Sequence, residues 1–161
     1  MKQFTTLIFL SISFLSYSEK GNERYSISAI VNCLAYTNQI KSAYIKCHND
    51  YLVFSTSDFL RVYKRDVGEL EKIDDKYKTP LGDVGFFSDE MLEFAKPSCY
   101  YSLTGIISKS NKLQLVILKW SEDSATKFSL QFKYVDDEWK FVVCELIRCP
   151  EGGREDRLKI E

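Results

Sequence analysis

The chain has 161 residues, of which 14% are aromatic, and a formal net charge of −1 at pH 7. A near-neutral chain lacks the basic excess with which proteins bind nucleic-acid phosphates, and it has no polybasic segment to hold it on an anionic membrane. The length suits one domain of ordinary size. Composition therefore predicts one folded domain with no nucleic-acid partner.

Residues 1–18 have the three-part pattern of a secretion signal. Lys2 supplies the positive start, residues 4–15 are apolar apart from threonine and serine, and serines stand at the two positions, 16 and 18, that a signal peptidase reads. The apolar run is too short to cross a bilayer of about 30 Å as a helix. No cysteine directly follows the expected cut after Ser18, so we expect no membrane anchor once the signal is removed. We predict an exported protein, periplasmic or extracellular.

Hydrophobic periodicity predicts helices in the first half of the remaining chain and strands in the second. Apolar residues recur at three- and four-residue steps from Ser26 to Cys47, which is typical of one long helix, and after Pro97 the period changes to two. Short polar connections between the strands indicate an antiparallel meander. The expected helices cover residues 25–47, 57–67 and 89–95, and the expected strands cover residues 99–108, 113–120, 127–134 and 139–147.

The predicted fold class is α+β, with a long N-terminal helix and short helices packed on a curved antiparallel sheet of about four or more strands. We expect one domain over residues 19–149. Residues 150–161 hold two glycines and mostly charged side chains, so we expect a disordered tail there.

This order of elements resembles the NTF2-like superfamily of cone-shaped α+β domains. The resemblance rests on the predicted helices and closing strands, and on the hairpin exit Asp137, Glu138, Trp139, Lys140, where a polar turn precedes a tryptophan on the final strand. It implies a concave pocket between the long helix and the sheet. The chain departs from the catalytic members, because it lacks the Asp/His pair that they use.

Five cysteines follow the predicted signal, and in an oxidising compartment pairing is the default, with one thiol left over. On one straight helix Cys33 and Cys47 would lie about 21 Å apart, too far for a bridge. Cys144 and Cys149 cannot bridge either if both lie in one extended strand, whereas a turn near residues 146–148 would allow it. We expect a helix cysteine to bridge a sheet cysteine, and the specific pairing stays open. The candidates are Cys33, Cys47, Cys99, Cys144 and Cys149.

Few residues offer catalytic chemistry. His48 is the only histidine, and it is either a general base or a polar residue at the end of a helix. Glu145 is an even number of residues from Trp139 and Phe141 in the predicted last strand, so its side chain lies on the same face and points into the core if that face is buried. A bulge after Val142 would move Glu145 to the opposite face. With one histidine and no C-x-x-C pair, we expect no metal site and no cofactor.

A loop at residues 80–87, which contains two glycines, carries two adjacent aromatic residues. Val84, Phe86 and Phe87 either cap the core or form a contact patch. If they are exposed, the two rings are the best candidate anchors for a protein partner.

These observations favour an exported, non-catalytic binding protein whose partner is another protein, for example an immunity protein that inhibits a toxic hydrolase. One alternative is an NTF2-like protein that holds a small apolar ligand between helix 25–47 and the sheet, with Glu145 or Tyr44 as polar anchor. The other alternative is a hydrolase-like enzyme that uses Glu145 or His48.

Cleavage of the predicted signal gives a mature protein that begins at Glu19. Mass spectrometry of the intact protein and of its N-terminal peptide, purified from its own cells, measures this end. An uncleaved chain confined to the cytoplasm would contradict the prediction of export.

Overall fold

An eight-stranded mixed sheet dominates the computed structural model, which describes residues 23–49, 51–122, 124–148 and 156–160. The chain divides into two units, Met1–Ile30 and Val31–Glu161, and every described strand lies in the second. The predicted signal and its cleavage site lie outside the described residues. Among the residues described, no helix is long and apolar enough to cross a membrane.

The elements follow one another in the order α2 (Ile27–Leu34), η1 (Ala35–Gln39, a 3-10 helix), β1 (Leu52–Ser55), α3 (Thr56–Asp66), β2 (Lys76–Thr79), β3 (Gly82–Phe87), α4 (Asp89–Ala95), β4 (Cys99–Lys109), β5 (Lys112–Ser121), β6 (Ser124–Val135), β7 (Glu138–Arg148) and β8 (Asp156–Ile160).

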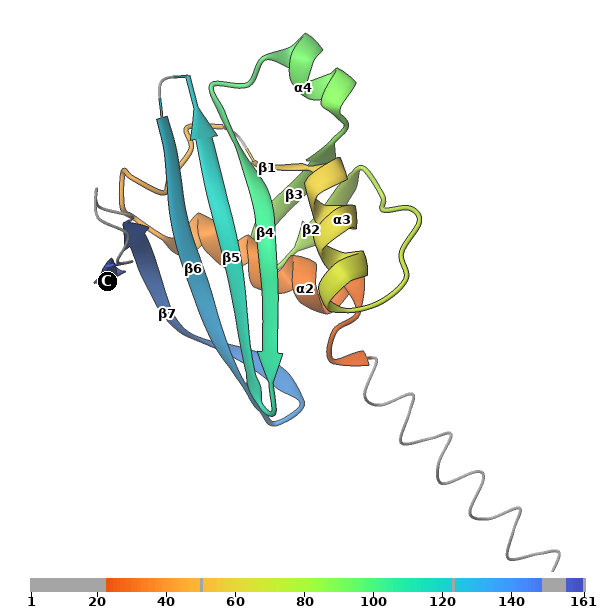
Figure 1. Cartoon of the computed structure of the whole chain (residues 1–161), viewed down its shortest axis with the longest axis vertical. Helices are drawn as coiled ribbons and strands as arrows, with labels where there is room; N and C mark the ends of the chain where they lie inside the picture. The colour runs from red at the N-terminus through yellow and green to blue at the C-terminus, as the bar shows by residue number, and fades with distance from the viewer. Residues whose placement is uncertain (1–22, 50, 123, 149–155, 161) are drawn as a thin grey trace, which may run out of the picture. The chain divides into compact units, whose positions relative to one another are not determined.

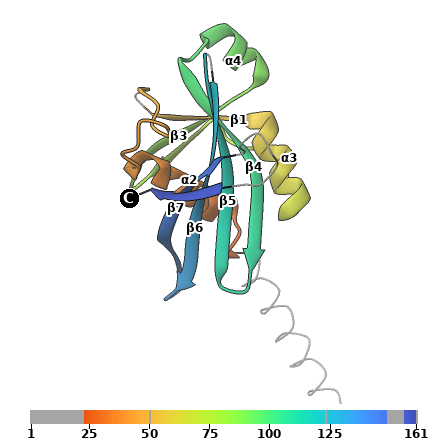
Figure 2. The same ribbon diagram turned by 60° about the vertical axis from the view of Figure 1, so that its left-hand side comes forward.

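The strands lie in the order β2-β3-β1-β4-β5-β6-β7-β8. β1 pairs in parallel with β3 and with β4, and the other neighbours are antiparallel. All four residues of β1 are buried, as expected for a parallel strand covered on both faces. The sheet twists strongly, so that β1 and β3 run across the direction of β4, β5 and β6 (Figures 1 and 2).

The predicted fold class is wrong in two respects. The long helix over 25–47 does not form, because α2 ends at Leu34 and the chain leaves η1 in an extended conformation at Ile40, where φ is −78° and ψ is 118°. The sheet is also larger than expected and includes parallel pairs, since Leu52–Ser55, Lys76–Thr79 and Gly82–Phe87 form strands where we predicted none. Asp156–Ile160, predicted to belong to a disordered tail, forms β8 along β7.

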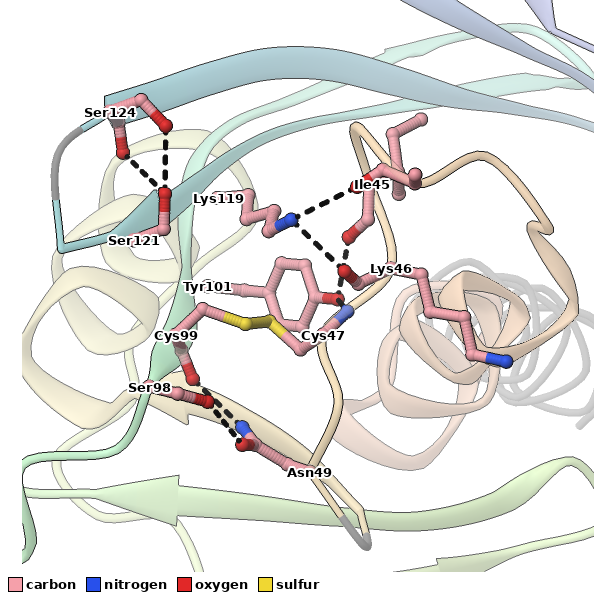
Figure 3. The surroundings of a disulfide bond; sticks show 11 residues. Ile45, Lys46, Cys47, Asn49, Ser98, Cys99, Tyr101, Lys119, Ser121 and Ser124 are labelled. Atoms are coloured by element: carbon pink, nitrogen blue, oxygen red, sulfur yellow. Dashed lines mark hydrogen bonds between the residues drawn. A yellow bond between two sulfur atoms is a disulfide. The ribbon is translucent and has the colours of Figure 1, made fainter.

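Residues 40–49, which we call the strap, are held in an irregular path by the strands instead of forming helix. Cys47 forms a disulfide with Cys99 at the start of β4. The Tyr101 hydroxyl donates a hydrogen bond to the Ile45 carbonyl at 2.8 Å and accepts one from the Cys47 N–H at 3.0 Å. Lys119 Nζ donates to the Lys46 carbonyl at 3.0 Å (Figure 3). These long-range contacts determine the path of the segment, although its periodicity favours a helix. Contacts with residues so distant in the chain cannot be predicted from the local sequence pattern.

The two short helices and the four-stranded meander are confirmed. Ser55 Oγ accepts a hydrogen bond from the Asp58 N–H and caps α3, and Ser88 Oγ accepts one from the Met91 N–H and caps α4. Pro97 follows the left-handed Lys96, where α4 ends. Periodicity was sufficient to predict these elements because the contacts that define them, including the serine caps, lie within the same short segments.

The meander β4–β7 has two faces of different character. On the face that we call the core face, Leu115, Leu130 and Cys144 are fully buried. Tyr36 of η1 packs on this face, with ring centroids 5.4 Å from Phe132 and 5.2 Å from Phe141. The opposite side, which we call the open face, has no described helix in front of β4, β5 and β6, and α3 lies beside β4 (Figure 1).

Removing the disulfide by Cys47→Ala with Cys99→Ala should lower the free energy of unfolding by about 4 kcal/mol, because the bridge closes a loop of 52 residues in the unfolded chain.

Tyr101→Phe keeps the ring but removes two hydrogen bonds, so we expect it to lower the free energy of unfolding by about 1–2 kcal/mol. Urea unfolding of the oxidised proteins measures both values. Unchanged stability in both variants would show that the strap is not held as described.

Stability should also fall steeply in alkali. Burial raises the pKa of the Cys33 and Cys144 thiols from 9.0 to about 12, and that of Tyr101 from 10.0 to about 12. The unfolded chain releases these protons at lower pH than the folded chain, so the stabilisation is complete below pH 9 and is lost as pH rises towards 12. Urea unfolding from pH 8 upwards measures the slope. Tyr101→Phe should show a shallower decline than the native chain, and equal slopes would contradict this assignment.

Candidate functional site

The predicted contact loop lies inside the sheet. Val84 and Phe86 are 0% and 1% exposed in β3, where they pair with Leu52 and Phe54 of β1, and Phe87 is half-buried. The first two side chains therefore belong to the core, which was one of the two interpretations of this loop. They cannot serve as exposed anchors for a partner.

The structure does not bring the other predicted site residues together. Tyr44 lies on the strap with 63% of its surface exposed, and His48 is exposed on the same segment. The strap contacts the core-face side chains Tyr101 and Lys119, whereas Glu145 lies on the open face. The geometry therefore provides neither a His48–Glu145 pair nor a pocket shared by Tyr44 and Glu145.

A bulge in β7 decides where Glu145 points. Gln131 pairs with Val143 and Phe132 pairs with Phe141, which leaves Val142 without a partner and reverses the alternation beyond it. Glu145 consequently lies beside Ser129 on the open face. Its carboxylate accepts a hydrogen bond from Gln131 Nε2 at 2.8 Å and lies 3.8 Å from the Arg157 guanidinium.

The cysteines behave as structural residues. The bridge Cys47–Cys99 joins the strap to the sheet. The expected bridge between a helix cysteine and a sheet cysteine is therefore wrong in its first half, because Cys47 is not helical. Cys33 and Cys144 are free and buried, and Cys149 lies outside the described residues. Within the described part of the chain, no group of His, Cys, Asp and Glu side chains could hold a metal ion.

The strand registers show what the open face presents. Cross-strand rows run over it from β4 towards β7 and β8, and exposure decreases from the outer rows towards the middle. In order from the β4–β5 turn, the rows are Lys109–Lys112–Lys133–Lys140, Ile107–Gln114–Gln131–Val143, Gly105–Val116–Ser129–Glu145–Lys159, Ser102–Leu118–Lys127–Ile147–Arg157 and Tyr100–Trp120–Ala125.

A groove of about 550 Å³ lies on this face between α3 and strands β4–β6. Its apolar wall consists of Ile107, Val116 and Leu118, and its polar end consists of Arg65 and Asp66 from the last turn of α3. Trp120, which is 39% exposed, continues the apolar strip along β5 beyond the groove. Ile107 is 55% exposed.

The polar end of the groove is a clasp on a second bulge, at Thr104. Arg65 Nη2 donates a hydrogen bond to the Thr104 carbonyl at 3.1 Å, and Asp66 accepts one from the Ile106 N–H at 2.9 Å. Arg65 also binds Asp66 through two hydrogen bonds, which lower the pKa of that carboxyl. The pair satisfies backbone groups that the bulge leaves unpaired, so it holds α3 against β4 rather than offering a free charge.

The outermost row is a ladder of lysines on four neighbouring strands. Lys109, Lys112, Lys133 and Lys140 occupy directly opposite positions, and all are exposed. Like charges directly opposite one another in a sheet destabilise it. Lys140 is paired with Glu138 at 3.2 Å. Within the described residues, the other three have no ion pair.

Sequence reasoning missed this surface, although part of its signal was visible. The alternation of Lys127, Ser129, Gln131 and Lys133 along β6 marked a polar face. Which residues of β4, β5 and β7 lie beside them depends on strand register and on the two bulges. Neither can be deduced from the pattern of one strand.

Comparison of the chain with family models, with curated proteins and with solved structures finds no match. The resemblance to NTF2-like domains therefore stays a prediction, and function has to be argued from the open face and its surroundings.

Proposed function

We propose that this chain is an exported, non-catalytic binding protein that contacts a protein partner through its open face. An inhibitor, such as an immunity protein, is one version of this function. The observation that carries the proposal is the apolar strip of Ile107, Val116, Leu118 and Trp120, which runs along β4 and β5 and is flanked by the groove. Apolar residues gathered on one surface, rather than scattered, are typical of interaction sites.

The residue type and the fixed orientation of Trp120 support the role of the strip as a protein interface. The strip includes a tryptophan, a residue type that is enriched at protein interfaces and that contributes large buried area. The Trp120 indole N–H donates to Ser102 Oγ at 2.9 Å, and its ring stacks with that of Tyr100 at 6.5 Å between centroids. These contacts orient the indole before a partner binds, which reduces the entropy lost on association.

The disulfide supports the exported part of the proposal. Bonds such as Cys47–Cys99 persist mainly in oxidising compartments outside the cytoplasm. This bridge joins segments separated by 52 residues and fixes the strap across the end of the meander. A protein that works outside the cell benefits from such a covalent restraint.

The small-ligand alternative has less support, because the pocket that it requires would lie on the core face. There Tyr36 packs against Phe132 and Phe141, and the aliphatic residues below them are fully buried. The concavity found on the open face is bordered by solvent-exposed Ile107 and is better suited to a protruding protein segment.

The proposal is tested by capturing the tagged full chain from its own cells and identifying partners present in stoichiometric amount. Ile107→Asp with Leu118→Asp places charge in the strip and should weaken the complex at least about tenfold, whereas Tyr44→Ser on the strap should leave it unchanged. Binding is measured by isothermal titration with the purified partner, and thermal unfolding verifies that each variant is folded.

Two outcomes would contradict the proposal. Equal binding by the native chain and by folded Ile107→Asp would remove the open face from the interface. Loss of binding in Phe94→Ser, which alters a side chain of α4 that is 93% exposed, without loss in the strip variants would place the interface on α4 instead.

A further inference from the structure

The fold concentrates positive charge on the open face although the whole chain has a net charge of −1. Besides the lysine ladder, this face carries Lys127, Arg157 and Lys159. The acid in its rows, Glu145, is already engaged by Gln131 and Arg157, and Asp66 at the edge of the groove is engaged by Arg65. The acidic side chains of α4, Asp89, Glu90 and Glu93, lie on a different element.

Among the described residues, most of the ladder has no acidic side chain paired with it. Lys112 lies directly between Lys109 and Lys133, and no ion pair to any of the three is formed within the described residues. Asp136 and Asp137 form the nearby β6–β7 turn, yet within the described residues the ion pair at this end of the ladder joins Glu138 to Lys140. An opposed row of like charges weakens a sheet, and a ligand that supplies the opposite charge would relieve this repulsion.

The spacing of the ladder selects the ligand. Neighbouring strands are about 4.8 Å apart, so the row spans about 14 Å, and the next row along the strands lies about 7 Å away. A helix is about 10 Å wide and repeats every 5.4 Å, so one helix lying across the strands covers both rows. Its carboxylates, one per turn, would then face successive lysines. An apolar residue beside them would contact Ile107, which is 55% exposed in the second row.

We propose that the lysine ladder binds an amphipathic, acidic helix of the partner protein, with its apolar side against Ile107 and the groove. This inference rests on the proposed function, which it deepens by giving the partner's chemistry. Single-stranded nucleic acid fits less well, because base stacking needs exposed rings and the rows beside the ladder contain isoleucine, glutamine and valine.

The probe is a synthetic Ala-rich helical peptide of about 20 residues, with Glu at every fourth position and Leu beside each Glu. Binding to the full chain is measured by fluorescence anisotropy between 50 and 300 mM NaCl, and should weaken as salt increases. Lys112→Glu with Lys133→Glu should raise Kd at least about tenfold. The matched control Lys72→Glu with Lys78→Glu makes the same change in net charge at exposed positions elsewhere, and should raise Kd less than about twofold.

Four outcomes would overturn the inference. Equal weakening in both double variants would mean that only net charge matters. Absence of peptide binding to the folded native chain would remove the acidic-helix ligand. Ladder-dependent binding to vesicles of phosphatidylserine and phosphatidylcholine, without binding to the peptide, would assign the ladder to a membrane surface. If the captured natural complex depends on Ile107 and Leu118 but tolerates the ladder variants, the proposed function stands and this inference alone fails.

Discussion

Phe54 contacts aromatic rings from the strands on both sides of it, and this contact joins the two parts of the sheet. Its ring centroid lies 6.1 Å from that of Phe86 in β3 and 5.3 Å from that of Tyr101 in β4. β1 is only four residues long, yet without it the β2–β3 hairpin and the β4–β8 meander would share no ladder. Tyr101 in turn holds the strap through its hydroxyl. The position of the strap, and the covering of this end of the core face, thus depend on β1.

Two bulges then decide what the other face presents. The one at Thr104 realigns β4 so that Gly105 lies beside Val116 and leaves backbone groups for Arg65 and Asp66 to bind. The one at Val142 moves Glu145 out of the core. Because each bulge reverses the alternation of its strand, a single inserted residue decides which side chains a partner could touch. The residues that the open face presents therefore depend on strand register more than on composition.

Sequence patterns correctly predicted the elements that are stabilised by residues close to them in the chain. The caps Ser55 and Ser88 and the alternation of β6 lie within a few residues of the structure that they define, and α3, α4 and the meander formed as expected. The strap has equally good helical periodicity, but its path is determined by Tyr101, Cys99 and Lys119, which lie more than 50 residues away in the chain. The prediction for the β3 segment was wrong for a related reason. Its glycines suggested turns, whereas Gly85 is buried beside β1, where an added Cβ would come within 2.9 Å of the Tyr51 ring.

The same distinction applies to charge. Near-neutral composition is a sound argument against strong, non-specific attraction to nucleic acid or to membranes, because that attraction depends on the field of the whole molecule. It says little about a specific site, because a field falls off within about 8 Å at physiological salt and a partner responds to the charges that it touches. In this chain, strand register places Lys109, Lys112 and Lys133 side by side, while acids elsewhere balance the total. A net charge of −1 and a basic patch on the open face are therefore compatible, because the fold places the basic and the acidic side chains on different parts of the surface.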